Sequence, residues 1–102
     1  MSDIREARKV LESRIVDGQG KVSPAERRAA FNNKGLAEPL AGLVDKVARH
    51  AYRVTDKDIE EAKQSGVTED QIFEIVVCAA VGQATRQYDV AAAALEAATR
   101  KE

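Results

Sequence analysis

Residues 68–82 read TEDQIFEIVVCAAVG, and this stretch decides the fold class. Thr68 and Gln71 have the spacing of a capping box, in which each side chain accepts a hydrogen bond from the other residue's backbone N–H. In the run 72–81 only Glu74 is polar, and a helix that is apolar nearly all round is buried on most of its sides. The sequence therefore predicts a helix that begins after this box and lies inside the protein.

The same helix continues well beyond the apolar run. No Pro follows, and residues 90–98 consist mainly of Ala, the best helix former, so we predict one helix from Glu69 to about Arg100 with Gly82 as its only weak point. A helix of about 30 residues is about 45 Å long, which is too long for a domain of this size to surround. We therefore expect a homo-oligomer in which a second subunit covers part of the helix. A kink at Gly82 that folds the helix back is the alternative.

Start and stop signals mark four shorter helices ahead of this one. The signals are capping Ser, Thr or Asp residues, Pro in a first turn, and Gly after a last turn. The predicted helices are Asp3–Val16, one from Ser23 to about Asn33, one from about Glu38 whose apolar stripe runs through Ala51 to Val54, and one from Thr55 to Gly66. Residues 1–102 are thus predicted to form a single all-α domain, a small bundle of about five helices that ends in a long Ala-rich helix.

Composition excludes several function classes. The chain has 102 residues with 16 Lys plus Arg against 17 Asp plus Glu. It therefore lacks the excess positive charge that is typical of nucleic-acid-binding proteins, and we expect no nucleic-acid partner. No apolar run is long enough to cross a bilayer and the N-terminus does not resemble a signal peptide, so we expect no membrane partner and a cytoplasmic location. The single cysteine rules out a disulfide within the chain.

The C-terminal half shows a family resemblance. Residues 66–72, GVTEDQI, follow an acid-capped helix and open an Ala- and Val-rich one. This pattern resembles the alkylhydroperoxidase D-like (AhpD-like), or carboxymuconolactone decarboxylase-like, family, and the resemblance implies that family's helical fold. It also implies a Cys-x-x-Cys-x-x-x-His motif, which falls on Ala51, Val54 and Asp58 when counted back from Gly66. Because redox cycling of a dithiol needs two thiols, the thiol peroxidase activity of the family is not expected here.

Few polar residues remain that could carry out catalysis. His50 is the only histidine and a candidate general base near neutral pH. Glu38 and Asp58 are the other candidate acid–base groups, provided that all three side chains converge on one cleft. Arg49 or Arg53 could then hold the carboxylate of a substrate.

A ligand-binding hypothesis rests on Tyr52, Arg53 and Asp58, which stand where the resemblance places the lost motif. Packing of Tyr52 at a helix end and capping by Asp58 are the simpler explanations of the same residues. Cys78 lies in the apolar run, where burial raises the pKa of a thiol, and we predict that it is a core residue. One His and one Cys far apart predict no metal site, and no cofactor is expected.

Together these features predict a non-redox, oligomeric binding or structural module with a small molecule as a candidate ligand. The sequence leaves an enzymatic role open, but it favours a role without catalysis. Two alternatives are an acid–base enzyme, similar to the decarboxylases of the family, that acts on a small organic acid, and a helical adaptor that binds another protein. Convergence of the acid–base candidates would favour the first, and a large apolar patch that stays exposed on the purified protein would favour the second.

Overall fold

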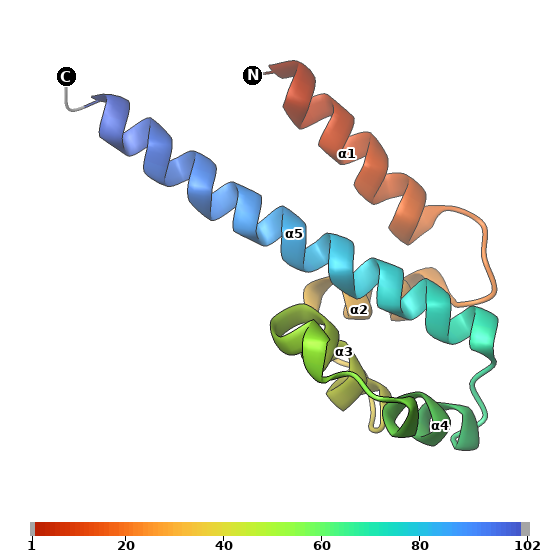
Figure 1. The fold of residues 1–102 in the computed structure, drawn as a ribbon. Helices are drawn as coiled ribbons and strands as arrows, with labels where there is room; N and C mark the ends of the chain where they lie inside the picture. Colours follow the sequence, from red (N-terminus) through yellow and green to blue (C-terminus); the bar gives the residue numbers. More distant parts are fainter. Residues whose placement is uncertain (1, 101–102) are drawn as a thin grey trace.

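The structure, a computed structural model, describes residues 2–100, with side chains from residue 6 onward, and all regular secondary structure in this part of the chain is helical. This part of the chain forms five α-helices, with a short 3-10 helix between the third and the fourth, and Figure 1 shows their arrangement. The elements are α1 (Ser2–Asp17), α2 (Pro24–Asn32), α3 (Leu40–His50), η1 (Ala51–Arg53), α4 (Asp56–Gln64) and α5 (Glu69–Arg100). This arrangement confirms the predicted small all-α bundle and its long last helix.

Reciprocal side-chain caps begin α4 and α5. The backbone N–H of Gln71 donates to Thr68 Oγ1 at 3.2 Å, and the N–H of Thr68 donates to Gln71 Oε1 at 2.9 Å. Thr55 and Asp58 form the same kind of pair ahead of α4. Each pair satisfies N–H groups that have no partner inside the helix, so the caps confirm both predicted starts.

The predicted apolar stripe is wrong at its C-terminal end, since α3 stops at His50. The backbone of His50 leaves the helical region at φ −145° and ψ 56°, and Ala51 begins η1. Val54 is extended, and Thr55 caps α4 with φ −121° and ψ 167°. Because a capping residue must itself be extended, the start at Thr55 separates α3 from α4.

The first half of α5 is the centre of the fold, with α2, α3 and α4 packed against it (Figure 1). Two groups of buried apolar side chains surround it, one toward α1, α2 and α3 and the other toward α3 and α4. The first comprises Val16, Val22, Ala30, Phe31, Val44, Ile75, Cys78 and Ala79, and the second comprises Leu43, Ala62 and Ile72. The apolar run is therefore buried, as its composition predicts.

Helix α5 passes Gly82 without a break, so the alternative of a kink there is wrong. Gly82 is buried, and a Cβ atom at this position would overlap the backbone carbonyl of Phe31 at the end of α2. Glycine is required here because only a residue without a side chain lets the two helices come this close.

Beyond Gly82, α5 runs past the bundle and lies beside α1 (Figure 1). We call residues 6–17 of α1 and 83–100 of α5 the arm. The Arg8 guanidinium and the Asp89 carboxylate form an ion pair between its two helices. The arm makes the molecule 55 Å long and gives it a radius of gyration of 15.5 Å. A compact domain with the same number of residues has a radius of gyration of about 13 Å. None of the helices over residues 2–100 has the length and apolar character needed to span a membrane.

Candidate functional site

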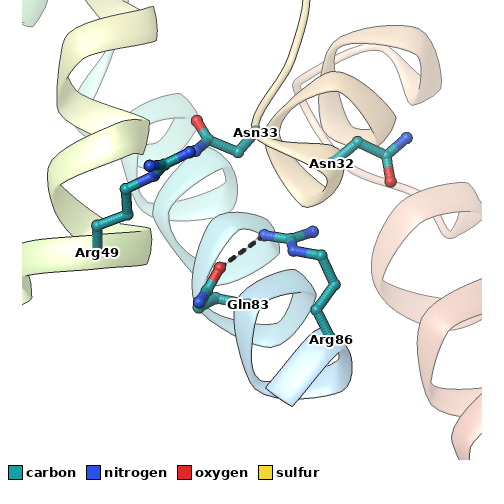
Figure 2. Close-up of a pocket in the computed structure, with 5 residues that line it drawn as sticks. All are labelled: Asn32, Asn33, Arg49, Gln83 and Arg86. Atoms are coloured by element: carbon teal, nitrogen blue, oxygen red, sulfur yellow. Dashed lines mark hydrogen bonds between the residues drawn. The ribbon is translucent and has the colours of Figure 1, made fainter. Parts of the chain in front are cut away.

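A polar cleft of about 300 Å³ lies where the end of α2 meets α3 and α5 (Figure 2). Its lining residues carry guanidinium or carboxamide groups, and they are Asn32, Asn33, Arg49, Gln83 and Arg86. None of these five side chains can act as a nucleophile or as a general acid or base near neutral pH. The cleft therefore suits binding better than catalysis.

Arg86 joins α5 to the end of α2. Its Nη1 donates to the backbone oxygen of Phe31 at 2.5 Å, and its Nη2 donates to Gln83 Oε1 at 3.0 Å (Figure 2). The last carbonyls of a helix lack partners within it and carry partial negative charge, so a guanidinium stabilises them. Arg86 thus caps α2, which is a structural role.

The opposite side of the cleft is held by Asp45 of α3. Asp45 Oδ1 accepts a hydrogen bond from Asn33 Nδ2 at 3.0 Å and lies 3.0 Å from Arg49 Nε. Asn33 ends α2 in the left-handed conformation that Asn tolerates. Both arginines of the cleft therefore have protein partners, and the cleft is explained as a polar joint between three helices.

The acid–base candidates Glu38 and His50 lie at the two ends of α3. Eleven helical residues span the interval, which is about 16 Å at 1.5 Å per residue. Glu38 Oε2 accepts a hydrogen bond from the N–H of Gly42 at 3.3 Å, while the His50 ring stands edge-on to that of Tyr52 with centroids 6.0 Å apart. An acid–base site that contains both residues would therefore need two subunits, and it stays a prediction.

Asp58 has a structural role at the start of α4. Lys46 Nζ donates to its two oxygens at 2.8 and 3.0 Å, and the N–H of Thr55 donates to Oδ2 at 2.9 Å. The Lys46 hydrogen bond, followed by the bond from Thr55, lowers the pKa of the Asp58 carboxyl below its ordinary value. A carboxylate held ionised in this way is a poor proton donor.

Tyr52 and Arg53 project from η1 into solvent. Tyr52 is 79% exposed, and the Arg53 guanidinium carbon lies 5.6 Å from the centre of its ring. Neither residue lines the polar cleft or the smaller cleft beside Cys78. Ligand binding by Tyr52, Arg53 and Asp58 stays a prediction, since none of the three lines either of these two clefts.

Cys78 is a core residue, as predicted. It is 1% exposed, and its Sγ lies 3.7 Å from the backbone oxygen of Ile15 at the end of α1. Burial raises the pKa of the Cys78 thiol, and the nearby positive charge of Arg27 only partly opposes this effect. A buried thiol with a raised pKa is unsuited to redox catalysis.

Comparison of the sequence with models of protein families, with curated proteins and with solved structures finds no match. Over residues 6–100, no three His, Cys, Asp or Glu side chains come together in a way that could hold a metal ion. The family resemblance and the function therefore rest on the residues themselves.

Proposed function

We propose that this chain is a non-redox helical module that works as a homo-oligomer, with the arm of one copy packed against the arm of another. In this proposal it is an alkylhydroperoxidase D-like protein that has kept the helical frame of the family and lost the dithiol. The observation that carries the proposal is the apolar surface that the arm exposes, with Val90 71% and Leu95 65% exposed.

The exposed apolar residues of α5 share one side of the helix. At 100° per residue, half of the circumference holds only apolar side chains from residue 90 onward, and these are Val90, Ala91, Ala94, Leu95, Ala97 and Ala98. The charged residues Asp89, Glu96 and Arg100 fall on the other half. On α1, the neighbouring Val10 and Leu11 are 48% and 49% exposed. Small Ala side chains let a second helix approach closely, which favours a helical partner.

A second copy of this chain is the partner that fits the arm best. Acidic and basic side chains are equal in number over residues 6–17 and 83–100, so two arms do not repel each other. The two helical segments of the arm are about 18 and 27 Å long and about 10 Å wide, so they offer on the order of 450 Å² before surface relief is counted. That figure approaches the roughly 800 Å² per partner of a standard interface.

The arm also gains stability from such a partner. Residues 83–100 have no buried side chain, although most of the stability of helices in proteins comes from tertiary packing. Packing against another copy would add to the contacts that the second half of α5 makes with α1 in its own chain.

The lack of redox chemistry is supported by the thiol content. Ala51 and Val54 stand at the positions that the resemblance assigns to the two cysteines. The only thiol, Cys78, is buried, and the pKa of its side chain is raised by that burial. No second thiol is present in the sequence to resolve an oxidised Cys78 within one chain.

Analytical ultracentrifugation over a range of protein concentrations tests the proposal. We expect a mass that is a multiple of 11.1 kDa and that falls toward the monomer on dilution. Leu95→Glu should yield a monomer of unchanged helicity, because it places a charge in the interface. Ala93→Glu is the matched control, since it adds the same charge on the polar half of the same exposed segment. A monomer at every concentration would overturn the proposal and favour the adaptor, in which a different protein covers the arm.

A further inference from the structure

Arg27 of α2 is a buried cation without an acidic partner. It is 4% exposed, and its one hydrogen bond to another described residue runs from Nη1 to the backbone oxygen of Ile15 at 3.3 Å. Its Nε has no hydrogen-bond partner, and no described carboxylate lies within 4.0 Å of the guanidinium. Arg27 is therefore a buried guanidinium that no acidic side chain among the described residues neutralises.

The next residue along α2 shows how unusual this is. Arg28 is partly exposed, and it has two carboxylates, with Nη1 2.5 Å from Glu12 Oε1 and Nη2 3.7 Å from Asp17 Oδ2. The buried arginine thus lacks the anions that its exposed neighbour has. Buried charges in proteins are as a rule paired, because removal from water destabilises an unpaired charge strongly. The structure therefore leaves room for an anion beside Arg27.

A cleft of about 140 Å³ provides that room, between the end of α1, α2 and the first half of α5. Arg14 and Gln19 line it together with Arg27, and Ile15, Phe73 and Val77 add an apolar wall next to Cys78. Two guanidinium groups and an apolar wall match a molecule with an anionic end and a hydrocarbon end.

Glu74 is the one acidic residue of this lining, and its carboxylate is already engaged. Its Oε1 accepts a hydrogen bond from the N–H of Lys21 at 2.9 Å, and its Oε2 accepts one from the N–H of Val22 at 2.8 Å. These bonds hold the Glu74 carboxylate on the loop between α1 and α2. The role of Glu74 is therefore to bind the backbone of this loop, and its carboxylate does not pair with Arg27.

We propose that this cleft binds a small organic monocarboxylate, with its carboxylate on Arg27 and Arg14 and its hydrocarbon part against Ile15, Phe73 and Val77. An inorganic anion would leave the apolar wall uncovered. The volume of the cleft limits the ligand to a few carbon atoms, of the order of isobutyrate. The proposed site takes Arg14 and Ile15 from the end of the α1 segment of the arm, whereas Val90 lies about 20 Å farther along α5 than Val77. Binding at this site therefore does not depend on self-association through Val90 and Leu95.

Titration of the ¹⁵N-labelled full chain, followed by NMR, tests the site with acetate, isobutyrate and sulfate at equal ionic strength. We expect saturable shifts of the amide signals of Gln19, Val77 and Cys78. Isobutyrate should bind several-fold more tightly than acetate because it buries additional carbon atoms. Arg27→Gln should weaken isobutyrate binding about tenfold or more. Lys57→Gln is the matched control, since it removes one positive charge from the exposed face of α4 and should leave binding unchanged.

Phe73→Ala keeps the test valid if Arg27→Gln fails to fold, because Phe73 is 70% exposed and its truncation should leave the bundle intact. We expect Phe73→Ala to weaken isobutyrate binding and leave acetate binding unchanged. Two results would overturn the proposal: no saturable shifts at these amides up to tens of millimolar isobutyrate, or equal shifts with sulfate, which would show that the apolar wall plays no part.

Discussion

The two halves of α5 belong to one unbroken helix and differ in almost everything else. Residues 69–82 contain every buried residue of the helix and pack against α2, α3 and α4. Residues 83–100 bury none and expose Val90 and Leu95. The first half is fixed by tertiary packing, while the second is kept helical by its Ala content and leaves its apolar side free. The comparison indicates that one helix both centres the core and presents a surface for association.

Truncation of an apolar residue in each half is expected to produce the largest contrast. Ile75 is 1% exposed and Leu95 is 65% exposed. Ile75→Ala should lower the free energy of unfolding by about 3 kcal/mol, because it removes buried methylenes and leaves a cavity. Leu95→Ala should change it by less than about 0.5 kcal/mol in the monomer. Urea unfolding at a concentration where the protein is monomeric measures both values, and similar losses would contradict the comparison.

Gly82 marks the boundary between the halves, and Gly82→Ala should have the next largest effect. The new Cβ would overlap the carbonyl of Phe31, so α2 and α5 must move apart. We expect a net loss of about 2 kcal/mol in the free energy of unfolding, even though Ala is the better helix former. Thermal unfolding measures the loss, and a gain in stability would show that the close approach does not constrain the fold.

Ala84→Gly, two residues farther along on the exposed side, is the control for this substitution. It should lower the free energy of unfolding by about 1 kcal/mol, through helix propensity alone.

Glu74 links the buried half to the loop between α1 and α2. Its carboxylate accepts hydrogen bonds from the N–H groups of Lys21 and Val22. Glu74→Gln keeps one oxygen but turns an N–H₂ group toward these donors, and we expect a loss of about 1.5 kcal/mol. Chemical denaturation measures this loss, and Glu69→Gln, in the exposed first turn of the same helix, is the control. Equal losses of stability in the two variants would contradict the claim that the Glu74 carboxylate stabilises the loop through these hydrogen bonds.

The smallest effect concerns α4, which packs against the buried half. The Lys46 and Thr55 hydrogen bonds keep the pKa of Asp58 lower in the folded chain than in the unfolded one. The resulting stabilisation is fully present above the unfolded value of about 4, and it is lost as the pH falls through the lower, folded value. Asp58→Asn should therefore flatten the acid side of a stability-versus-pH curve. Asp56→Asn, in the same helical turn, should leave that slope unchanged, and equal slopes for all three proteins would contradict the account.

The order of the helices could be predicted from sequence because their signals are local. The predicted pair Thr68–Gln71 and the predicted cap at Thr55 each depend on residues within one helical turn, and both form. The predicted stripe through Val54 failed because two local signals competed there, apolar periodicity and a cap, and the cap prevailed. Gly82 looked like a weak point because the contact with Phe31 is not visible in the sequence.

The clefts could not be predicted, because they depend on contacts between distant segments. Arg27 and Arg28 are adjacent and chemically identical, yet only the fold makes one buried and the other exposed. Arg86 caps a carbonyl 55 residues earlier in the chain. The candidates chosen from sequence, Glu38, His50 and Asp58, were selected for their chemistry alone. The predicted helix from about Glu38 already placed Glu38 and His50 about three turns apart, and their chemistry alone gave no reason for them to converge.

The most direct test of self-association is hydrogen–deuterium exchange along α5, measured at several protein concentrations. Residues 72–82 should exchange slowly at every concentration because they are buried in the core. We expect the amides of residues 86–98 to be protected at high concentration, to lose that protection on dilution, and to remain unprotected in Leu95→Glu. Fast exchange of this segment at all concentrations, or protection that does not change on dilution, would contradict the claim that a second copy covers the arm.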